Sequence, residues 1–509
     1  MKKINIKKIW GIVFYTAITV LFILIVGDLV ADKLTWGARW SSGLPLGGVD
    51  NWLNEEGSFY TVPENGFTPG SSYFPGIILL SLLYRLLFGY GAETAIIVTG
   101  GIIALLSSVG FAAIVTSNKK RIAILTLVAL LIFRKMLLAP HYLLEMHPDI
   151  PALMCMTWGI IAMYKCIQKK RIIHYVLATL CFIGAGLFKQ NAVAMFLGLG
   201  LYTMFTQQLD IKTKVKVLLS EFIAGVCVLI VVFAIDGCWY NCVTVNASHP
   251  LLSIKEYITF GISTCKHNKI LLGLLAIYIV QRIFDDRKLG LLHNMYSYAA
   301  LSWLVFCMYG AAKLGANEGN MEAAIIALMP FVLSIFNDSI TIVKNYIEKE
   351  EIWNKISSLK YLNVRYLTCI IVIGAFCMYP LYHKVRVIKR NINEYYHRLD
   401  RQKDFSQWIS ETYTNKNVAY NTVHYEILNH ASIRKTSDFY TIAVWDMGGL
   451  ISDESIEKIA QDEAWDVIIT IDGEDETRWP ITFSHFQQLD SIDYPNIGDD
   501  NTKVYVRAE

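Results

Sequence analysis

The sequence has too little charge for an ordinary soluble protein. Only 17% of its 509 residues are charged and 54% are hydrophobic, whereas soluble domains carry about 25% charged residues. The net charge of +3 says little about partners, because lysines and arginines cluster between apolar runs and acids predominate from about Asp438. We therefore predict a mainly α polytopic membrane protein in contact with the lipid bilayer, and we expect no nucleic-acid partner.

Several recurrent motifs are missing. The ten cysteines follow no disulfide-scaffold or zinc spacing, and most lie inside apolar runs. Cys238, Cys242 and Cys265 share one polar stretch and are able to pair if it faces an oxidising compartment. No small-residue cleavage site follows the first apolar run, which therefore reads as a retained anchor. The acidic C-terminal region has no phosphate-binding glycine loop and no nucleophile elbow.

The apolar runs and the basic loops between them predict the topology. A span needs about 20 apolar residues, and cytoplasmic loops are rich in Lys and Arg. The lysines near the N-terminus place it inside, and the later basic loops then fix the direction of each span. We predict about eleven spans, N-in and C-out: Ile9–Val30, Ala92–Val115, Ile122–Phe133, Ile150–Ile167, Ile172–Phe188, Ala192–Phe205, Leu218–Ile235, Ile270–Phe284, Leu291–Ala312, Ala323–Phe336 and Tyr366–Tyr382.

Two further segments differ from these spans. Tyr73–Gly89 is apolar but short and contains Arg85, which predicts a helix at the membrane interface. From residue 384 the pattern becomes that of a soluble protein, with an amphipathic helix followed by helix and strand patterns. We predict two domains, a transmembrane domain (1–383) and a small extracytoplasmic α/β domain (384–509).

The predicted topology places the unusual ionisable residues on the outer face, in five loops that could converge on one site. Two of them also have a purely structural explanation. Asp149 would be an N-cap or first-turn acid that the helix dipole favours, and Lys189 a cation that the dipole favours at a helix C-terminus. Several of the other residues, such as Glu55, Glu318 and Lys313, would be explained simply as charged loop side chains in contact with water. The full set is Asp50, Glu55 and Glu56; His141, Glu145, His147 and Asp149; Lys189; His249; and Lys313, Glu318 and Glu322.

Three stretches resemble the GT-C superfamily of membrane glycosyltransferases, such as protein O-mannosyltransferases and lipid A aminoarabinose transferases. Val49–Gly89 is similar to the first outer loop of that family, Glu145–Met154 to its acidic second loop, and Gly184–Phe196 to its Gly-x-x-x-Lys signature. Asn51 departs from the family, which often has Glu at this position. The resemblance covers most of the chain.

The resemblance implies transfer of a sugar from a polyprenyl-phosphate donor to an acceptor hydroxyl, with inversion. It assigns catalytic roles to Asp50, as the base that takes the hydroxyl proton, and to Asp149, which orients the sugar or acceptor or holds His147 in one tautomer. Glu55 and Glu56 are alternatives to Asp50. Lys189 would face the leaving phosphate. The substrate-binding set is Lys189, His147, Glu145, Glu55, Glu56, Arg134 and Gln190.

The sequence leaves several alternatives open. A divalent metal bridging Asp50 and Asp149 is possible, because some relatives depend on metals and others do not. The acceptor is a glycan, a lipid or a protein, and the expected location is a bacterial plasma membrane. A polysaccharide polymerase or ligase is the strongest rival, although such enzymes usually have arginine-rich outer loops. A transporter would carry ionisable groups near the bilayer midplane, whereas here they lie at span ends.

Overall fold

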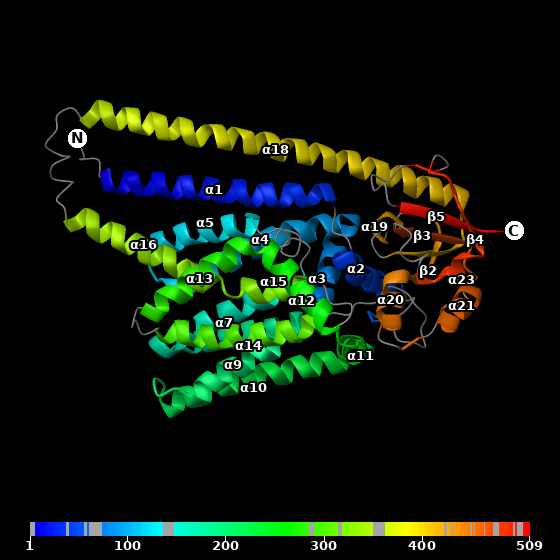
Figure 1. The fold of residues 1–509 in the computed structure, drawn as a ribbon, viewed down its shortest axis with the longest axis horizontal. Helices are drawn as coiled ribbons and strands as arrows, with labels where there is room; N and C mark the ends of the chain where they lie inside the picture. Colours follow the sequence, from blue (N-terminus) through cyan, green and yellow to red (C-terminus); the bar gives the residue numbers. More distant parts are fainter. Residues whose placement is uncertain are drawn as a thin grey trace.

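A computed structural model describes most of the chain as a long helical bundle with a small sheet at one end (Figure 1). The described residues are 6–36, 40–54, 59–60, 74–135, 147–284, 290–313, 318–349, 362–421, 425–428, 431–447, 450–451, 453–462, 464–471, 478–491, 494–495 and 502–508.

A helix covers each of the eleven predicted spans, to within one residue at the end of two of them. A turn at 327–328 divides the tenth predicted span between two helices. The helices concerned are α1 (Ile6–Trp36), α4 (Ala92–Val115), α5 (Lys119–Lys135), α7 (Asp149–Lys169), α8 (Ile172–Phe188), α9 (Ala192–Phe205), α10 (Ile211–Ala234), α13 (Lys269–Phe284), α14 (Leu291–Ala311), α15 (Glu318–Ile326), α16 (Met329–Lys349) and α18 (Leu362–Thr412).

Within the described residues, four segments are long and apolar enough to cross a membrane. They are Ala92–Val115, Asp149–Lys169, Ile211–Ala234 and Met321–Thr341. Large apolar side chains on the outside of the bundle, such as Phe205 and Phe233, are exposed, as lipid-facing residues would be. The number of crossings and the N-in, C-out direction stay predictions.

The remaining helices lie mainly at the end of the bundle that carries the sheet. The predicted interfacial helix is present as α3 (Pro75–Phe88), followed by the short η2 (Gly89–Gly91). Residues 40–53, which we predicted as loop, form a helix, as do residues 254–267. These elements are α2 (Trp40–Leu53), η3 (Tyr240–Val245), α11 (Asn246–Ser248) and α12 (Ile254–His267).

Close helix packing depends on small residues, and Gly198 on α9 shows this most clearly. A methyl group at Gly198 would lie 2.4 Å from the carbonyl oxygen of Tyr298 on α14. That carbonyl belongs to the helix backbone, so it cannot rotate away. Gly225 on α10 is the contrasting case, because a methyl group there would meet no atom within 4 Å.

We expect Gly198→Ala to lower the free energy of unfolding by about 1–3 kcal/mol, the usual cost of overpacking a core. Gly225→Ala is the matched control, and it should be neutral or stabilising because glycine weakens a helix interior. The unfolding of both variants in detergent can be followed by thermal or denaturant titration. Equal midpoints for the two variants would contradict this account of the α9–α14 contact.

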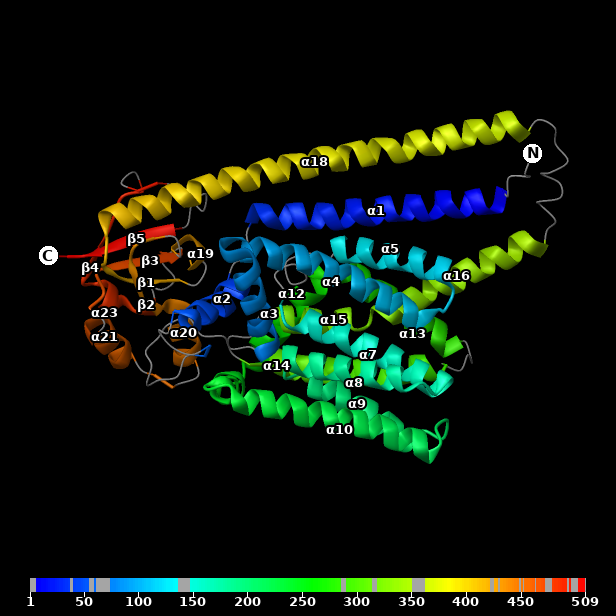
Figure 2. The same ribbon diagram turned by 180° about the vertical axis from the view of Figure 1, so that it is seen from behind.

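The 51-residue helix α18 connects the bundle to the sheet. It runs beside α1 and continues past the bundle into the C-terminal region (Figures 1 and 2). The predicted domain boundary at 383/384 therefore falls inside one continuous helix, and the division into two domains stays a prediction.

The C-terminal region contains a five-stranded mixed sheet in the order β2-β1-β3-β5-β4. The strand patterns in DVIITI and TKVYVR are present as β3 and β5, and β1 covers NVAY, whereas β2 and β4 were not predicted. β2, β1 and β3 are parallel, and β5 pairs antiparallel with β3 and β4. The elements are β1 (Asn417–Tyr420), α19 (Tyr425–Leu428), β2 (Arg434–Asp438), α20 (Phe439–Met447), α21 (Asp453–Asp462), β3 (Val467–Ile471), α23 (Pro480–Phe483), β4 (Phe486–Gln488) and β5 (Thr502–Arg507).

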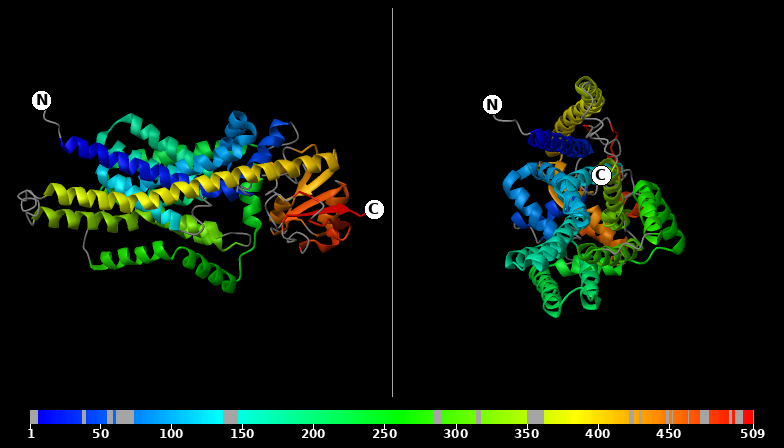
Figure 3. Two further views of the ribbon diagram at one scale, coloured as in Figure 1. Left: turned by 90° about the horizontal axis from the view of Figure 1, so that it is seen from above. Right: turned by 90° about the vertical axis from the view of Figure 1, so that its left-hand side faces the viewer.

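The sheet region packs against the adjacent end of the bundle. Val245 and Tyr240 of η3 join the apolar cluster that contains Phe439 and Trp465, and α19 contacts α2. Figure 3 shows the strands gathered at this end of the helices. Helix α2, which carries Asp50, therefore lies at the end of the bundle next to the sheet.

Candidate functional site

Asp149 lies at the start of α7 and is completely buried. Pro148 precedes it, and the Ile150 amide donates to the His147 carbonyl at 3.1 Å, which fixes the turn into the helix. Only residues 170 and 171 separate α7 from α8, and the two helices pack side by side. The end of α8 therefore returns to the level of Asp149, where Lys189 follows its last residue in an extended conformation.

Two basic side chains meet the same carboxylate oxygen. Lys189 Nζ lies 3.0 Å and His147 Nδ1 2.7 Å from Asp149 Oδ2, and all three side chains are buried. Neither contact is aligned as a hydrogen bond, and Asp149 Oδ1 has no hydrogen-bond partner among the described residues. A buried carboxylate oxygen normally accepts hydrogen bonds. This oxygen is therefore a candidate acceptor of a hydrogen bond from a hydroxyl group of a bound molecule.

Asp50 forms a second buried ion pair. Its Oδ2 accepts from Arg85 Nη2 at 2.8 Å, and Arg85 Nη1 donates to the Gly89 carbonyl at 3.0 Å. Asp50 lies near the C-terminal end of α2, and Arg85 lies in the last turn of α3. The sequence analysis treated Arg85 only as an interruption of an apolar helix and did not predict that it pairs with Asp50.

One apolar cluster joins the regions of the two ion pairs. It contains Val49, next to Asp50, and Leu187, two residues before Lys189. The approach is close, since a methyl group at Gly76 of α3 would lie 2.8 Å from the Leu187 carbonyl oxygen. The first predicted loop, which carries Asp50, and the third, which carries Lys189, therefore meet at this end of the bundle.

Tyr60, Cys238 and Cys242 form a buried polar contact inside that cluster. The two Sγ atoms lie 4.0 Å apart, and both thiols are free. Burial raises the pKa of Tyr60 well above its usual value, so the phenol stays protonated beside the thiols. Cys265, which we considered as a pairing partner, is an exposed free thiol on α12.

Contacts also join the third loop, which carries Lys189, to the fourth, which carries His249, and the fourth loop to the fifth, which carries Lys313. Gln190 Nε2 donates to the Cys242 carbonyl at 3.3 Å. Lys313 Nζ donates to the Asn246 carbonyl at 2.7 Å. All five predicted loops are thus linked, each to at least one other, by contacts at one end of the bundle.

Some predicted residues lie elsewhere or outside the described residues. Arg134 Nε pairs with Asp28 Oδ2 of α1 at 3.0 Å, and its Nη1 lies 3.6 Å from Asp32 Oδ2. It would have to leave these carboxylates to bind a phosphate, so its role in substrate binding stays a prediction. Glu55, Glu56, His141 and Glu145 lie outside the described residues.

The described residues do not fit a metal site. No group of three or more His, Cys, Asp or Glu side chains in this part of the chain comes together in a way that could hold an ion. Asp50 and Asp149, the predicted bridging pair, each face a basic side chain instead.

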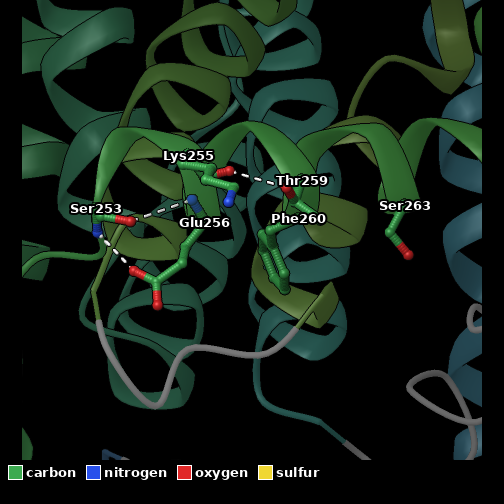
Figure 4. Close-up of a pocket in the computed structure, with 6 residues that line it drawn as sticks. All are labelled: Ser253, Lys255, Glu256, Thr259, Phe260 and Ser263. Carbon is green, nitrogen blue, oxygen red and sulfur yellow. Dashed lines mark hydrogen bonds between the residues drawn. The ribbon is translucent and has the colours of Figure 1, made fainter.

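A separate pocket of about 600 Å³ lies along α12 (Figure 4). Ser253, Glu256 and Thr259 are among its lining residues, and it contains none of the predicted site residues. Ser253 and Glu256 form a capping box at the start of α12, with bonds of 3.3 and 2.9 Å. That Ser-x-x-Glu pattern was visible in the sequence and could have predicted this helix.

The described geometry can be compared with known structures. ArnT from Cupriavidus metallidurans in the apo state matches with a TM-score of 0.56 over 99% of this chain and 98% of its own, at 13% identity. The chain has the ArnT fold. The resemblance to the GT-C superfamily is thus confirmed for the fold.

Further comparisons add little to the ArnT match. The oligosaccharyltransferase AglB from Archaeoglobus fulgidus, in complex with an inhibitory peptide and a dolichol-phosphate, matches with a TM-score of 0.47 at 10% identity. That match covers 99% of this chain and 75% of AglB. No family model and no curated protein matches the sequence.

Proposed function

We propose that this protein is a membrane glycosyltransferase that moves a sugar from a polyprenyl-phosphate donor to an acceptor hydroxyl. The ArnT fold supports this reaction class. The observation that carries the proposal is the buried Asp149 carboxylate, which contacts Lys189 and leaves Oδ1 without a partner among the described residues. This group lies where loops distant in the sequence meet.

In the proposed reaction, the acceptor oxygen forms a bond to the anomeric carbon of the donor. The phosphate leaves with the electron pair of the broken carbon–oxygen bond, and a carboxylate takes the hydroxyl proton. We assign the base to Asp50, and we assign its orientation to Arg85, which holds one of its oxygens at 2.8 Å. Attack from the face opposite the phosphate inverts the anomeric centre.

Lys189 and Asp149 act on the donor in this proposal. The phosphate gains charge as it leaves, and a fixed cation in a buried site stabilises that charge strongly. We assign this cation to Lys189, which Asp149 positions. Asp149 Oδ1 would accept a hydrogen bond from a hydroxyl group of the sugar or the acceptor, and His147 on the other oxygen would restrict the carboxylate's rotation.

The proposal can be tested with purified protein and a panel of undecaprenyl- and dolichyl-phosphate sugars. We expect release of free lipid phosphate from at least one donor when an acceptor hydroxyl is present. Release of the lipid phosphate only when the donor is a lipid-linked oligosaccharide would favour the polymerase or ligase alternative. Movement of a substrate across vesicles without cleavage would favour the transporter alternative.

A further inference from the structure

Contacts among three helices, α1, α5 and α18, define one level of the bundle. Arg134 at the end of α5 pairs with Asp28 of α1. Next to Asp28, a methyl group at Gly27 would lie 3.8 Å from Ile388 Cδ1 of α18. These contacts align Asp28, Arg134 and Ile388, and Figures 1 and 2 show α1 beside α18 along its length.

The surface on the two sides of this level differs. Towards the start of α1, the outward side chains are apolar, with Tyr15, Val20 and Ile23 exposed, and the apolar run Tyr366–Tyr382 lies in the matching part of α18. In the other direction, Tyr395 of α18 bonds to Thr94 in the first turn of α4 at 2.7 Å. The level of Asp28 and Ile388 therefore fits the boundary between hydrocarbon and headgroups.

Three basic side chains of α18 face outward at this boundary. Arg386, Lys389 and Arg390 are exposed, whereas the residue that follows them, Asn391, is buried. Their spacing of three and four residues places them on one side of the helix. Among the described residues, no carboxylate pairs with them, and Glu394, the first acid after them, pairs with Arg401 at 3.2 Å.

We propose that Arg386, Lys389 and Arg390 form a binding face for anionic phospholipid headgroups where α18 leaves the bilayer. Guanidinium groups bind phosphate oxygens in pairs, and a net negative lipid surface attracts each basic side chain near it. Because α18 continues without a break to the sheet, this contact also fixes the height of the C-terminal region above the membrane. The proposal does not depend on the proposed transferase activity.

The test uses the full chain purified from bilayers that contain equal parts of phosphatidylcholine and phosphatidylglycerol. Native mass spectrometry of the detergent-extracted protein then counts the retained lipids. We expect several-fold enrichment of phosphatidylglycerol on the wild type, and loss of that enrichment in the triple variant Arg386→Gln, Lys389→Gln, Arg390→Gln. High salt during extraction should reduce the wild-type enrichment in the same way.

The control removes three other exposed bases, in the variant Lys403→Gln, Arg434→Gln, Lys458→Gln. It has the same net charge as the test variant and should keep the wild-type enrichment. Unchanged enrichment in the test variant would overturn the proposal, as would equal loss in both variants. If the test variant does not fold, the salt dependence and the three single variants provide the decisive measurements.

Discussion

Asp50→Asn is expected to reduce sugar transfer by roughly 10²–10⁴-fold, the usual contribution of a general base. Asparagine keeps the shape of the side chain, and its carbonyl oxygen can still accept from Arg85. It cannot take a proton from the acceptor hydroxyl. The loss should therefore appear in kcat for lipid-phosphate release at saturating donor, with little change in the unfolding midpoint.

Two variants separate catalysis at Asp50 from the effect of removing a charge. Asp404→Asn on the exposed side of α18 removes one acid that belongs to neither ion pair and should leave the rate unchanged. Arg85→Gln should slow transfer less than Asp50→Asn, because it disturbs the base's orientation but leaves its carboxylate. If Asp50→Asn turns over at nearly the wild-type rate, the base is another residue, and Glu55 and Glu56 become the candidates.

The long helices could be predicted because each apolar run is bounded by charges or by turn residues. Helix α2 could not be predicted in this way. It contains Pro45 and three glycines, Gly43, Gly47 and Gly48, and those residues disfavour a helix interior. Packing against α3 and α19 offsets that preference. Asp50 therefore belongs to a packed helix and not to an open loop.

Part of the candidate site followed from topology alone. The short turn between α7 and α8 requires the start of one helix and the end of the next to lie together, so Asp149 and Lys189 could be placed on the same face. Their direct contact, and the insertion of His147 against the same oxygen, depend on side-chain packing that has no local signal. The pairing of Asp50 with Arg85 likewise joins residues 35 positions apart.

The Asp149–Lys189 pair allows a double-mutant test in which stability and activity should separate. Lys189→Met leaves a fully buried carboxylate without its nearest ammonium group, and breaking such a pair typically costs about 3–5 kcal/mol. Asp149→Asn leaves a buried ammonium without its carboxylate and should also be strongly destabilising. These losses can be measured by denaturant unfolding in detergent.

The double variant removes both charges, so neither is left buried without its partner. We expect it to be more stable than the sum of the single effects predicts, by roughly 0.5–3 kcal/mol. The exposed pair Arg401–Glu394, at 3.2 Å, is the matched control. A cycle with Arg401→Gln and Glu394→Gln should give a coupling of only about 0–1 kcal/mol, as surface pairs do.

Activity should not recover with stability. If Lys189 stabilises the leaving phosphate, the double variant lacks that cation and should remain as inactive as Lys189→Met. A purely structural ion pair would behave differently, because restoring stability would restore lipid-phosphate release as well. A double variant that is both stable and active would remove Lys189 and the negative charge of Asp149 from the proposed chemistry, and the role of Asp50 is tested separately.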